Sequence, residues 1–368
     1  MIDKNVSRPI AFFIPSLSGG GAQRVVVNLA NALIELTGHP VHVVLVRREG
    51  PFLEDLDSGI KVVELKGCRT ILAVPSLVAY LMRWRPVVTM ASMNYANITA
   101  VLAYLIAGKP GRLVLRETNV LVPKVQKCLD VRFHVMALMM RLCYRHANAI
   151  VSNSEDTLTS LKNFNVVLPA NSQVIGNPIT IPDAGIELGY RGPEGTPFIC
   201  AVGRLTPQKG FDILMRAFAE VGDPDLHLVI LGNGPLRTDL LELAKELGLA
   251  SKLHLPGFIN PPTPVLRNAK AFVLSSRWEG FGNVLVEALG CGLPIVATKC
   301  PGGPREILEA GRYGQLVPVD DVAALAKAIR EALDSPVATT VSRKARANDY
   351  APRVVAQKYL DKVLIPPA

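Results

Sequence analysis

The sequence of 368 residues contains no hydrophobic segment long enough to cross a membrane. A membrane-spanning helix needs about 20 consecutive apolar residues, and the nearest candidate, residues 87–108, is interrupted by Ser92, Asn94 and Asn97. The apolar run at residues 11–14 is also too short to form the core of a signal peptide. These absences favour a cytoplasmic protein without a membrane-spanning segment.

Cysteine pairs with redox or zinc-binding spacing are also absent. The six cysteines, at positions 68, 128, 143, 200, 291 and 300, form no C-x-x-C pair and have no histidines at zinc-site spacing. Disulfides are rare in a reducing cytoplasm. We therefore expect buried thiols and no metal site built on cysteine.

The dinucleotide-binding fingerprint G-x-G-x-x-G is missing. A strand expected at residues 10–15 is followed by GGGAQR at residues 19–24, so Arg24 occupies the place of the third glycine, and no acidic residue follows at the required distance. This disfavours a nicotinamide-dependent dehydrogenase. The glycines still permit a tight turn and a close approach of backbone to phosphate, which makes Gly20 and Gly21 candidate ligand contacts.

Length, composition and charge indicate two domains with different surfaces. Hydrophobic residues make up 49% of the chain, enough for two buried cores. Of the net charge of +9, residues 1–170 contribute most, with 19 Lys and Arg against 11 Asp and Glu, whereas residues 171–368 have 21 against 20. An anionic partner is therefore expected at the first half. The basic residues are not interleaved with aromatics, which disfavours nucleic acid as that partner.

Short apolar runs alternate with helical patterns, which is typical of parallel α/β units. Strands are expected at residues 10–15, 42–46, 62–65, 87–91, 112–115 and 149–152, and in a second series at 198–202, 227–231, 271–275, 294–298 and 315–319. Proline and glycine crowd the region between the two series. We predict an α/β protein with a first domain at 1–178, a linker at 179–197, a second domain at 198–350 and a C-terminal helix at 351–368.

The most informative segment contains two carboxylates eight residues apart. Glu279 lies in a Gly-rich turn after the strand expected at residues 271–275, and Glu287 lies two turns into the following helix. The first N–H groups of that helix have no intrahelical partner, and with the helix dipole they form an anion site. A nucleotide-sugar, with phosphates at the helix start and hydroxyl groups on either side, suits both carboxylates.

A basic loop at residues 203–210 follows the first strand of the second domain and contains Arg204 and Lys209. Open α/β sheets bind ligands at the carboxyl ends of their strands. Since a charge-assisted hydrogen bond contributes about 1.5–3 kcal/mol, these two cations could hold a diphosphate without a metal. Two Asp-x-Asp triplets, residues 55–57 and 223–225, are interpreted as surface turns.

These segments resemble the Glu-x7-Glu region and the G-R-x-x-x-x-K-G loop of the retaining glycosyltransferases of family 4. The resemblance covers nearly the whole chain and is strongest over residues 198–320. It implies the GT-B fold, with two Rossmann-like domains that face each other across a cleft and a last helix that crosses back to the first domain. It also implies transfer of a hexosyl or N-acetylhexosaminyl unit, with retention, from a UDP-linked donor to a hydroxyl of a glycan or lipid-linked acceptor in lipopolysaccharide or polysaccharide synthesis.

The resemblance assigns a role to each candidate residue. Glu287 accepts a hydrogen bond from the nucleotide ribose and Glu279 from the donor sugar, while Arg204 and Lys209 stabilise the departing diphosphate. Glu279, Arg204 and Lys209 are thus the expected catalytic residues. Further donor contacts are expected at Gly20, Gly21, Gly234, Phe281, Gly282 and Asn283. No metal and no other cofactor is expected, because the nucleotide-sugar is a substrate.

The sequence identifies the residues that contact the acceptor less clearly than those that contact the donor. Many family members have a histidine followed by an acid near the position of Arg116-Glu117-Thr118-Asn119, and this chain does not. Glu117 and Asn119, at the end of the strand expected over residues 112–115, are the candidates for acceptor contact. A structural ion pair is the alternative interpretation.

A stripe of basic residues in the first half of the chain indicates a surface that could contact the membrane carrying a lipid-linked acceptor. Lys127, His134, Arg141 and Arg145 share one helix face. The apolar residues opposite them are Val125, Leu129, Met136, Met140 and Cys143. This pattern suits a helix at an anionic membrane surface, and hence a peripheral protein on the inner face of the cell membrane. An ordinary solvated helix is the alternative.

Two other functional classes remain open. A GT-B sugar-nucleotide epimerase would need acid and base groups of its own and no acceptor, and incubation with UDP-GlcNAc alone would reveal an epimer. A non-catalytic nucleotide-sugar-binding protein is disfavoured by the full set of donor residues, and a donor hydrolysis assay distinguishes it.

Overall fold

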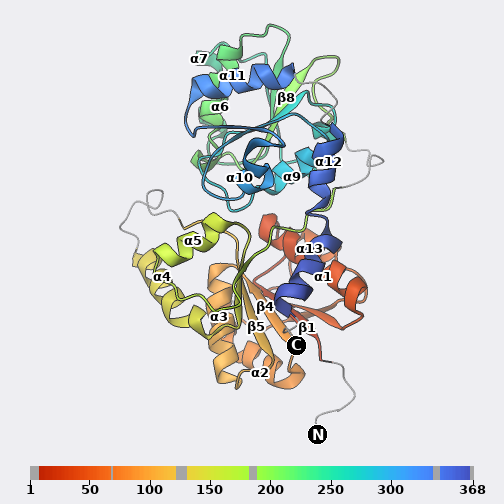
Figure 1. Cartoon of the computed structure of the whole chain (residues 1–368), viewed down its shortest axis with the longest axis vertical. Helices are drawn as coiled ribbons and strands as arrows, with labels where there is room; N and C mark the ends of the chain where they lie inside the picture. Colours follow the sequence, from red (N-terminus) through yellow and green to blue (C-terminus); the bar gives the residue numbers. More distant parts are fainter. Residues whose placement is uncertain (1–7, 68, 122–130, 182–188, 335–339, 365–368) are drawn as a thin grey trace. The chain divides into compact units, whose positions relative to one another are not determined.

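The computed structural model describes residues 8–67, 69–121, 131–181, 189–334 and 340–364. They form two compact units (Figure 1): the first takes in the described parts of Met1–Ile179 and Pro352–Ala368, and the second those of Thr180–Ala351. The unit boundaries thus lie at residues 179/180 and 351/352, beside the expected domain ends at 178 and 350. Each unit contains one parallel sheet covered by helices.

The first sheet has the strand order β3-β2-β1-β4-β5-β6-β7, and every neighbouring pair is parallel. Its strands are β1 (Ile10–Ile14), β2 (Val41–Leu45), β3 (Lys61–Glu64), β4 (Val88–Ser92), β5 (Arg112–Glu117), β6 (Ala149–Ser152) and β7 (Gln173–Val174). The two-residue strand β7 was not expected from the sequence. The order reverses between β1 and β4, which is the switch point at which doubly wound sheets bind ligands.

Helices cover both faces of this sheet because successive side chains of each buried strand point to opposite sides. Phe12 and Ile14 of β1 pack into one core with α1 (Gly21–Thr37), while Phe13 packs into the other. The helices of the second face are α2 (Val74–Trp84), α3 (Asn94–Ile106) and α4 (Val131–Cys143). The helix α5 (Glu155–Asn163) follows β6.

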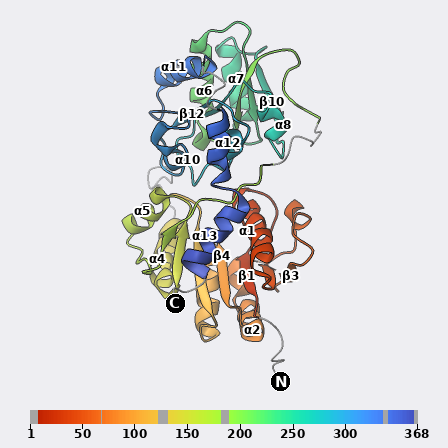
Figure 2. The same ribbon diagram turned by 45° about the vertical axis from the view of Figure 1, so that its right-hand side comes forward.

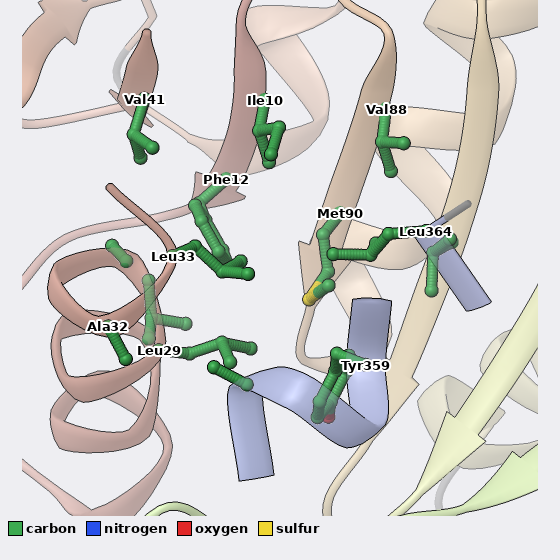
Figure 3. Close-up of a cluster of buried hydrophobic side chains, with 14 of the residues drawn as sticks. Ile10, Phe12, Leu29, Ala32, Leu33, Val41, Val88, Met90, Tyr359 and Leu364 are labelled. Atoms are coloured by element: carbon green, nitrogen blue, oxygen red, sulfur yellow. The ribbon is translucent and has the colours of Figure 1, made fainter. Parts of the chain in front are cut away.

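The end of the chain completes the first core. Helix α13 (Pro352–Tyr359) and the turn after it (Leu360–Leu364) place Tyr359 and Leu364 among side chains of α1, β1 and β4 (Figure 3). Full burial of one such side chain contributes about 1.5–3 kcal/mol. The described part of the C-terminal segment therefore belongs to the first unit although it follows the second in sequence.

The second sheet has the order β10-β9-β8-β11-β12-β13, again with parallel neighbours. Its strands are β8 (Phe198–Val202), β9 (His227–Leu231), β10 (Leu253–Gly257), β11 (Ala271–Leu274), β12 (Ile295–Thr298) and β13 (Gln315–Val317). Its switch point lies between β8 and β11, where β8 is flanked by β9 on the other side.

Helices again connect these strands. They are α6 (Phe211–Val221), α7 (Arg237–Glu246), α8 (Thr263–Leu266), α9 (Asn283–Gly290), α10 (Pro304–Ile307), α11 (Val322–Leu333) and α12 (Thr340–Asn348). Helices α6 and α11 pack side by side on one face (Figure 2), with α7 in the same core. Helix α9 packs against β11 and β12. No helix in the described part of the chain is long and apolar enough to cross a membrane.

Candidate functional site

Three predicted residues come together at the switch point of the second sheet. Arg204 and Lys209 lie in the loop after β8, and Glu279 lies in the loop after β11. Because β8 and β11 are parallel neighbours, the two loops emerge at the same edge of the sheet. The Lys209 Nζ atom lies 2.6 Å from Glu279 Oε1. The strand order therefore joins two motifs that are 70 residues apart in the sequence.

The carboxylate of Glu279 is held at one oxygen. Its Oε1 accepts hydrogen bonds from Lys209 Nζ and from Ser276 Oγ, both at 2.6 Å, and the residue is only 5% exposed. A buried carboxylate is stable only when it is paired and hydrogen-bonded. The Oε2 atom has no partner among the described residues and is not one of the fully buried unpaired atoms, so it reaches solvent. Glu279 thus presents a fixed acceptor to a ligand.

Arg204 is an exposed cation in the same loop as Lys209. Within the described part of the chain, its side chain makes no ion pair and no hydrogen bond. A guanidinium group has five N–H donors in a planar fork that matches a phosphate group. Lys209 therefore supplies positive charge at Glu279, and Arg204 adds an exposed cation in the same loop.

Arg277 fixes the two loops to each other. Its backbone N–H donates to the Gln208 carbonyl at 2.7 Å, and its guanidinium donates to the Pro207 carbonyl and to both carboxylate oxygens of Asp212. A further bond of 2.7 Å reaches Asp320. The hydrogen bonds with Asp212 raise the pKa of Arg277 above its ordinary value. The turn that carries Lys209 is therefore held against the loop that carries Glu279.

Two glycines at this site are required by packing. A Cβ atom at Gly302, which has φ of 120°, would overlap the carbonyl oxygen of Glu279. A Cβ atom at Gly234 would overlap the backbone of Leu205, next to Arg204. Gly234, a predicted donor contact, therefore has a structural reason to lack a side chain, and it lies beside the basic loop.

The other predicted residues of the second unit surround the start of α9. Gly282 precedes the helix in the left-handed region with φ of 95°, and Asn283 is the first helical residue. The Phe281 ring is buried against Tyr350, with the ring centroids 5.4 Å apart, so only its backbone can serve a ligand. Glu287 is half-buried on α9. Gly282 and Asn283 thus follow Glu279 at the same edge of the sheet, as the spacing predicts.

The glycine turn of the first unit lies at the switch point of the first sheet. Gly20 has φ of 120° and caps α1, and Gly21 is the first residue of that helix. Arg24, which replaces the third glycine of the fingerprint, pairs with Asp55 at 2.6 Å and stacks on the Phe52 ring. The turn is exposed and open to a ligand of the first unit.

Glu117 does not lie where a substrate could touch it. The strand β5 continues two residues beyond the expected end, and Glu117 pairs in register with Ser152 of β6. It is 0% exposed and accepts hydrogen bonds from Asn97 and Tyr144. Burial raises its pKa to about 7. The expectation of acceptor contact was wrong for Glu117, because strand and helices enclose it, and its hydrogen-bond partners are neutral rather than an ion pair.

Two residues that the sequence analysis overlooked lie at the same edge of the first sheet. Met93, directly after β4, has φ of 85°, a strained conformation for a residue that is not glycine. Tyr95 lies in the first turn of α3 (Asn94–Ile106) and is 60% exposed. Asn119, the other acceptor-side candidate, is also exposed. No motif in the sequence distinguishes Met93 or Tyr95 from other residues that follow a strand.

The Asp-x-Asp triplets form turns. Asp57 accepts from the backbone of Gly59 at 2.8 Å, and Asp223 accepts from the backbone of Asp225 at 2.9 Å. Over the described ranges, no three His, Cys, Asp or Glu side chains are arranged to hold a metal ion.

Helix α4 exposes a face that is basic along one edge and apolar along the other. Met140 and Cys143 are buried in the core, so the Met-rich side is not the exposed side. The exposed residues include the basic side chains His134 and Arg141, and Arg145 is exposed in the 3-10 turn that follows the helix (Tyr144–His146). Beside them lie Val135, Leu138 and Leu142, which are 53%, 51% and 48% exposed. Val125, Lys127 and Leu129 of the predicted stripe lie outside the described residues.

Comparison with known proteins gives matches to both halves of the chain. Residues 19–181 match Glycosyltransferase Family 4, and residues 190–353 match Glycosyl transferases group 1. The chain is 30% identical to N-acetylgalactosamine-N,N'-diacetylbacillosaminyl-diphospho-undecaprenol 4-alpha-N-acetylgalactosaminyltransferase of Campylobacter jejuni, over 97% of this chain and 96% of that relative. It is 28% identical, over 86% of both chains, to the lipopolysaccharide core biosynthesis glycosyltransferase LpsD of Rhizobium meliloti.

A solved structure has a similar fold. Anabaena HepE in complex with UDP-glucose superposes with a TM-score of 0.79 and 21% identity, over 96% of this chain and 98% of that one. At this identity the similarity concerns the fold.

Proposed function

Because the chain belongs to family 4 of the glycosyltransferases, a retaining family with the GT-B fold, we propose that it transfers a hexosyl or N-acetylhexosaminyl unit from a UDP-sugar to a hydroxyl of a lipid-linked glycan. The observation that carries this proposal is the arrangement around Glu279. One carboxylate oxygen is held by Lys209 and Ser276 and the other is open, with Arg204 exposed in the adjoining loop.

The donor fits this arrangement group by group. The diphosphate lies at Arg204 and Lys209, the sugar hydroxyls donate to the open oxygen of Glu279, and the ribose hydroxyls donate to Glu287. The N–H groups at Phe281, Gly282 and Asn283 face the sugar and the β-phosphate. UDP as the nucleotide is supported by the fold shared with HepE, whose solved complex contains UDP-glucose.

Catalysis follows from charge that develops on the leaving group. As the glycosidic bond breaks, negative charge grows on the β-phosphate, and fixed cations stabilise it more in the transition state than in the ground state. Lys209 is positioned for this by Glu279 and by the turn that Arg277 holds. We propose attack on the same face that the diphosphate leaves, with a phosphate oxygen taking the acceptor proton, and no metal.

The acceptor is proposed to be a glycan carried on a lipid in cell-envelope synthesis. The name of the Campylobacter relative specifies a saccharide linked to diphospho-undecaprenol, and LpsD acts in lipopolysaccharide core biosynthesis. In the first unit, Asn119 and the exposed Tyr95 replace Glu117 as candidate acceptor contacts. The exposed face of α4 supports a peripheral position at the inner face of the cell membrane.

A donor screen tests the proposed function. The protein is incubated with single nucleotide-sugars that differ in sugar and in base, and slow hydrolysis is followed by mass spectrometry. We expect hydrolysis of one or a few UDP-sugars, with loss in Glu279→Gln. Formation of an epimer instead of free sugar would indicate a sugar-nucleotide epimerase, and binding without hydrolysis or transfer would indicate a non-catalytic protein.

Removal of the hydrogen bonds that Arg277 makes is expected to weaken catalysis without removing a contact to the donor. In Arg277→Gln the turn at residues 207–209 loses its charge-assisted bonds, so Lys209 is less well placed. We expect kcat/KM to fall about tenfold or more, equivalent to one lost bond of about 1.5–3 kcal/mol. Arg216→Gln, which removes an exposed arginine of α6, is the matched control and should retain full activity. Equal activity of both variants would rule out a positioning role for Arg277.

Membrane binding through α4 is expected to depend on charge and on apolar contact. Each basic residue near an anionic leaflet contributes about 1 kcal/mol. The double variant Arg141→Glu/Arg145→Glu loses two such contributions and adds two repulsive charges. It should therefore bind phosphatidylglycerol vesicles at least about 30-fold less tightly in co-sedimentation, and Leu138→Ser/Leu142→Ser should also bind less tightly.

The matched control for this membrane test is Arg48→Glu/Lys66→Glu, which reverses two exposed charges elsewhere in the first unit. It should leave most of the binding intact. If the wild type binds vesicles equally well at low and high salt, or if the control variant loses as much binding as the α4 variants, the α4 face is an ordinary solvated surface.

A further inference from the structure

A partly polar pocket lies on the opposite edge of the second sheet from Glu279. Its volume is about 130 Å³, and it opens at the amino ends of β12 and β13, where Ile295 and Gln315 contribute to its wall. All neighbouring strands of this sheet are parallel, so Glu279 and Lys209 lie at the other ends of the strands. A ligand in this pocket would be additional to the donor.

The pocket is lined by two arginines and by no acidic residue. Arg312 is exposed, and its guanidinium carbon lies 5.2 Å from the centroid of the Tyr313 ring. Its one ion pair among the described residues is a solvent-exposed pair with Glu309 at 3.2 Å, which contributes little. Arg343, on α12, is 8% exposed. Among the described residues, its guanidinium makes one hydrogen bond, from Nη1 to the Gly292 carbonyl at 3.3 Å, and no carboxylate pairs with it. Burial lowers the pKa of Arg343.

A buried cation without a counterion is costly, and the cost falls when an anion binds. The guanidinium of Arg343 has five N–H donors, and the protein satisfies one of them. None of its nitrogens is among the fully buried unpaired atoms of the described chain, so the remaining donors reach the solvent of the pocket. The pocket therefore contains an array of donors that lacks an acceptor.

We infer that this pocket binds a small phosphate- or sulfate-type oxyanion between Arg343 and Arg312. The planar guanidinium fork matches two oxygens of such an anion. Gln315 and Tyr313, which also line the pocket, have an amide and a hydroxyl that can act as neutral donors. The volume admits several water molecules and hence a tetrahedral anion. The chain thus has an anion site separate from its donor site.

The test measures thermal unfolding of the full chain against inorganic phosphate at constant ionic strength. Saturating UDP is present throughout, so that phosphate does not act at the donor site. We expect the unfolding temperature to rise with phosphate by mass action. In Arg343→Gln, the same rise in unfolding temperature should need at least about tenfold more phosphate, because one charge-assisted hydrogen bond to the anion is lost.

The matched control is Lys344→Gln, which removes the same charge from the neighbouring exposed position of α12 and does not line the pocket. Its response to phosphate should equal that of the wild type. A second variant, Gln315→Glu, keeps the side-chain shape and places a negative charge in the pocket. It should abolish the response even if Arg343→Gln fails to fold. If Arg343 merely ties α12 to the Gly292 loop, its replacement changes basal stability and leaves the phosphate response intact.

Vesicles that contain phosphatidic acid, used in place of inorganic phosphate, distinguish the source of the anion. If inorganic phosphate raises the unfolding temperature in a way that depends on Arg343, the ligand of the pocket is a free anion. If only the vesicles give such a response, the ligand is a lipid headgroup. If neither ligand gives a response that is lost in Arg343→Gln or Gln315→Glu, the inference is overturned.

Discussion

Replacement of Glu279 by glutamine is expected to lower kcat about 30- to 1000-fold, which corresponds to a loss of about 2–4 kcal/mol of transition-state stabilisation. The side-chain shape is kept, but the open acceptor loses its charge and Lys209 loses its counterion. Steady-state kinetics with saturating donor measures the effect. Thermal unfolding of the variant separates lost chemistry from lost stability.

Glu287→Gln is the matched control for this experiment, since it removes the other carboxylate of the pair. If Glu287 meets the ribose, the change weakens donor binding in both ground and transition states, so KM for the donor rises while kcat changes little. Full activity in both variants would show that neither carboxylate contacts the donor.

Loss of both fixed cations is expected to be more damaging still. In Arg204→Ala/Lys209→Ala the departing diphosphate loses two charge-assisted bonds of about 1.5–3 kcal/mol each, so kcat/KM should fall about 10²- to 10⁴-fold. The wild type should keep its activity in EDTA, because these cations and the α9 N-terminus supply the positive charge.

Lys209→Gln and Arg204→Gln, made singly, show which cation matters more, and exposed Lys245→Ala on α7 controls for loss of charge alone. Removing one partner of a buried pair costs about 3–5 kcal/mol, so folding of the Lys209 variants is checked by thermal unfolding. Activity that is lost in EDTA and restored by Mn²⁺ would contradict the proposal and direct attention to the Asp-x-Asp turns.

Local signals in the sequence were sufficient for most of the second unit. Strands followed by Gly-rich turns located the loops that carry Lys209 and Glu279, since these patterns depend on neighbouring residues alone. The cap of α11 is equally local, because Asp321, the residue before the helix, accepts a hydrogen bond from the Ala324 backbone at 2.9 Å.

What the sequence could not supply is which side chains meet across the fold. Arg277 bonds to Asp212 and Asp320, 65 and 43 residues away, and no spacing rule connects them. Glu117 was misjudged because a polar residue at a strand end looks the same whether helices cover it or not. Its partners Asn97 and Tyr144 come from separate elements of the sequence.

The choice of apolar residues on α4 that would contact a membrane was wrong for a related reason. Apolar residues occur on both sides of this helix, and periodicity does not tell which side packs on the sheet. The structure buries Met140 and Cys143 and leaves Leu138 and Leu142 exposed beside Arg141. His134, Arg141 and Arg145 are exposed as predicted, while the apolar residues beside them were identified only from the structure.

The most direct test of the donor site is a crystal structure of the protein with an intact UDP-sugar. The proposal predicts a sugar hydroxyl within hydrogen-bonding distance of Glu279 Oε2 and a β-phosphate in contact with Lys209 and Arg204. It also predicts a ribose hydroxyl at Glu287. A UDP-sugar bound elsewhere, with the Lys209–Glu279 pair unchanged and Glu279 Oε2 in contact with water alone, would contradict it.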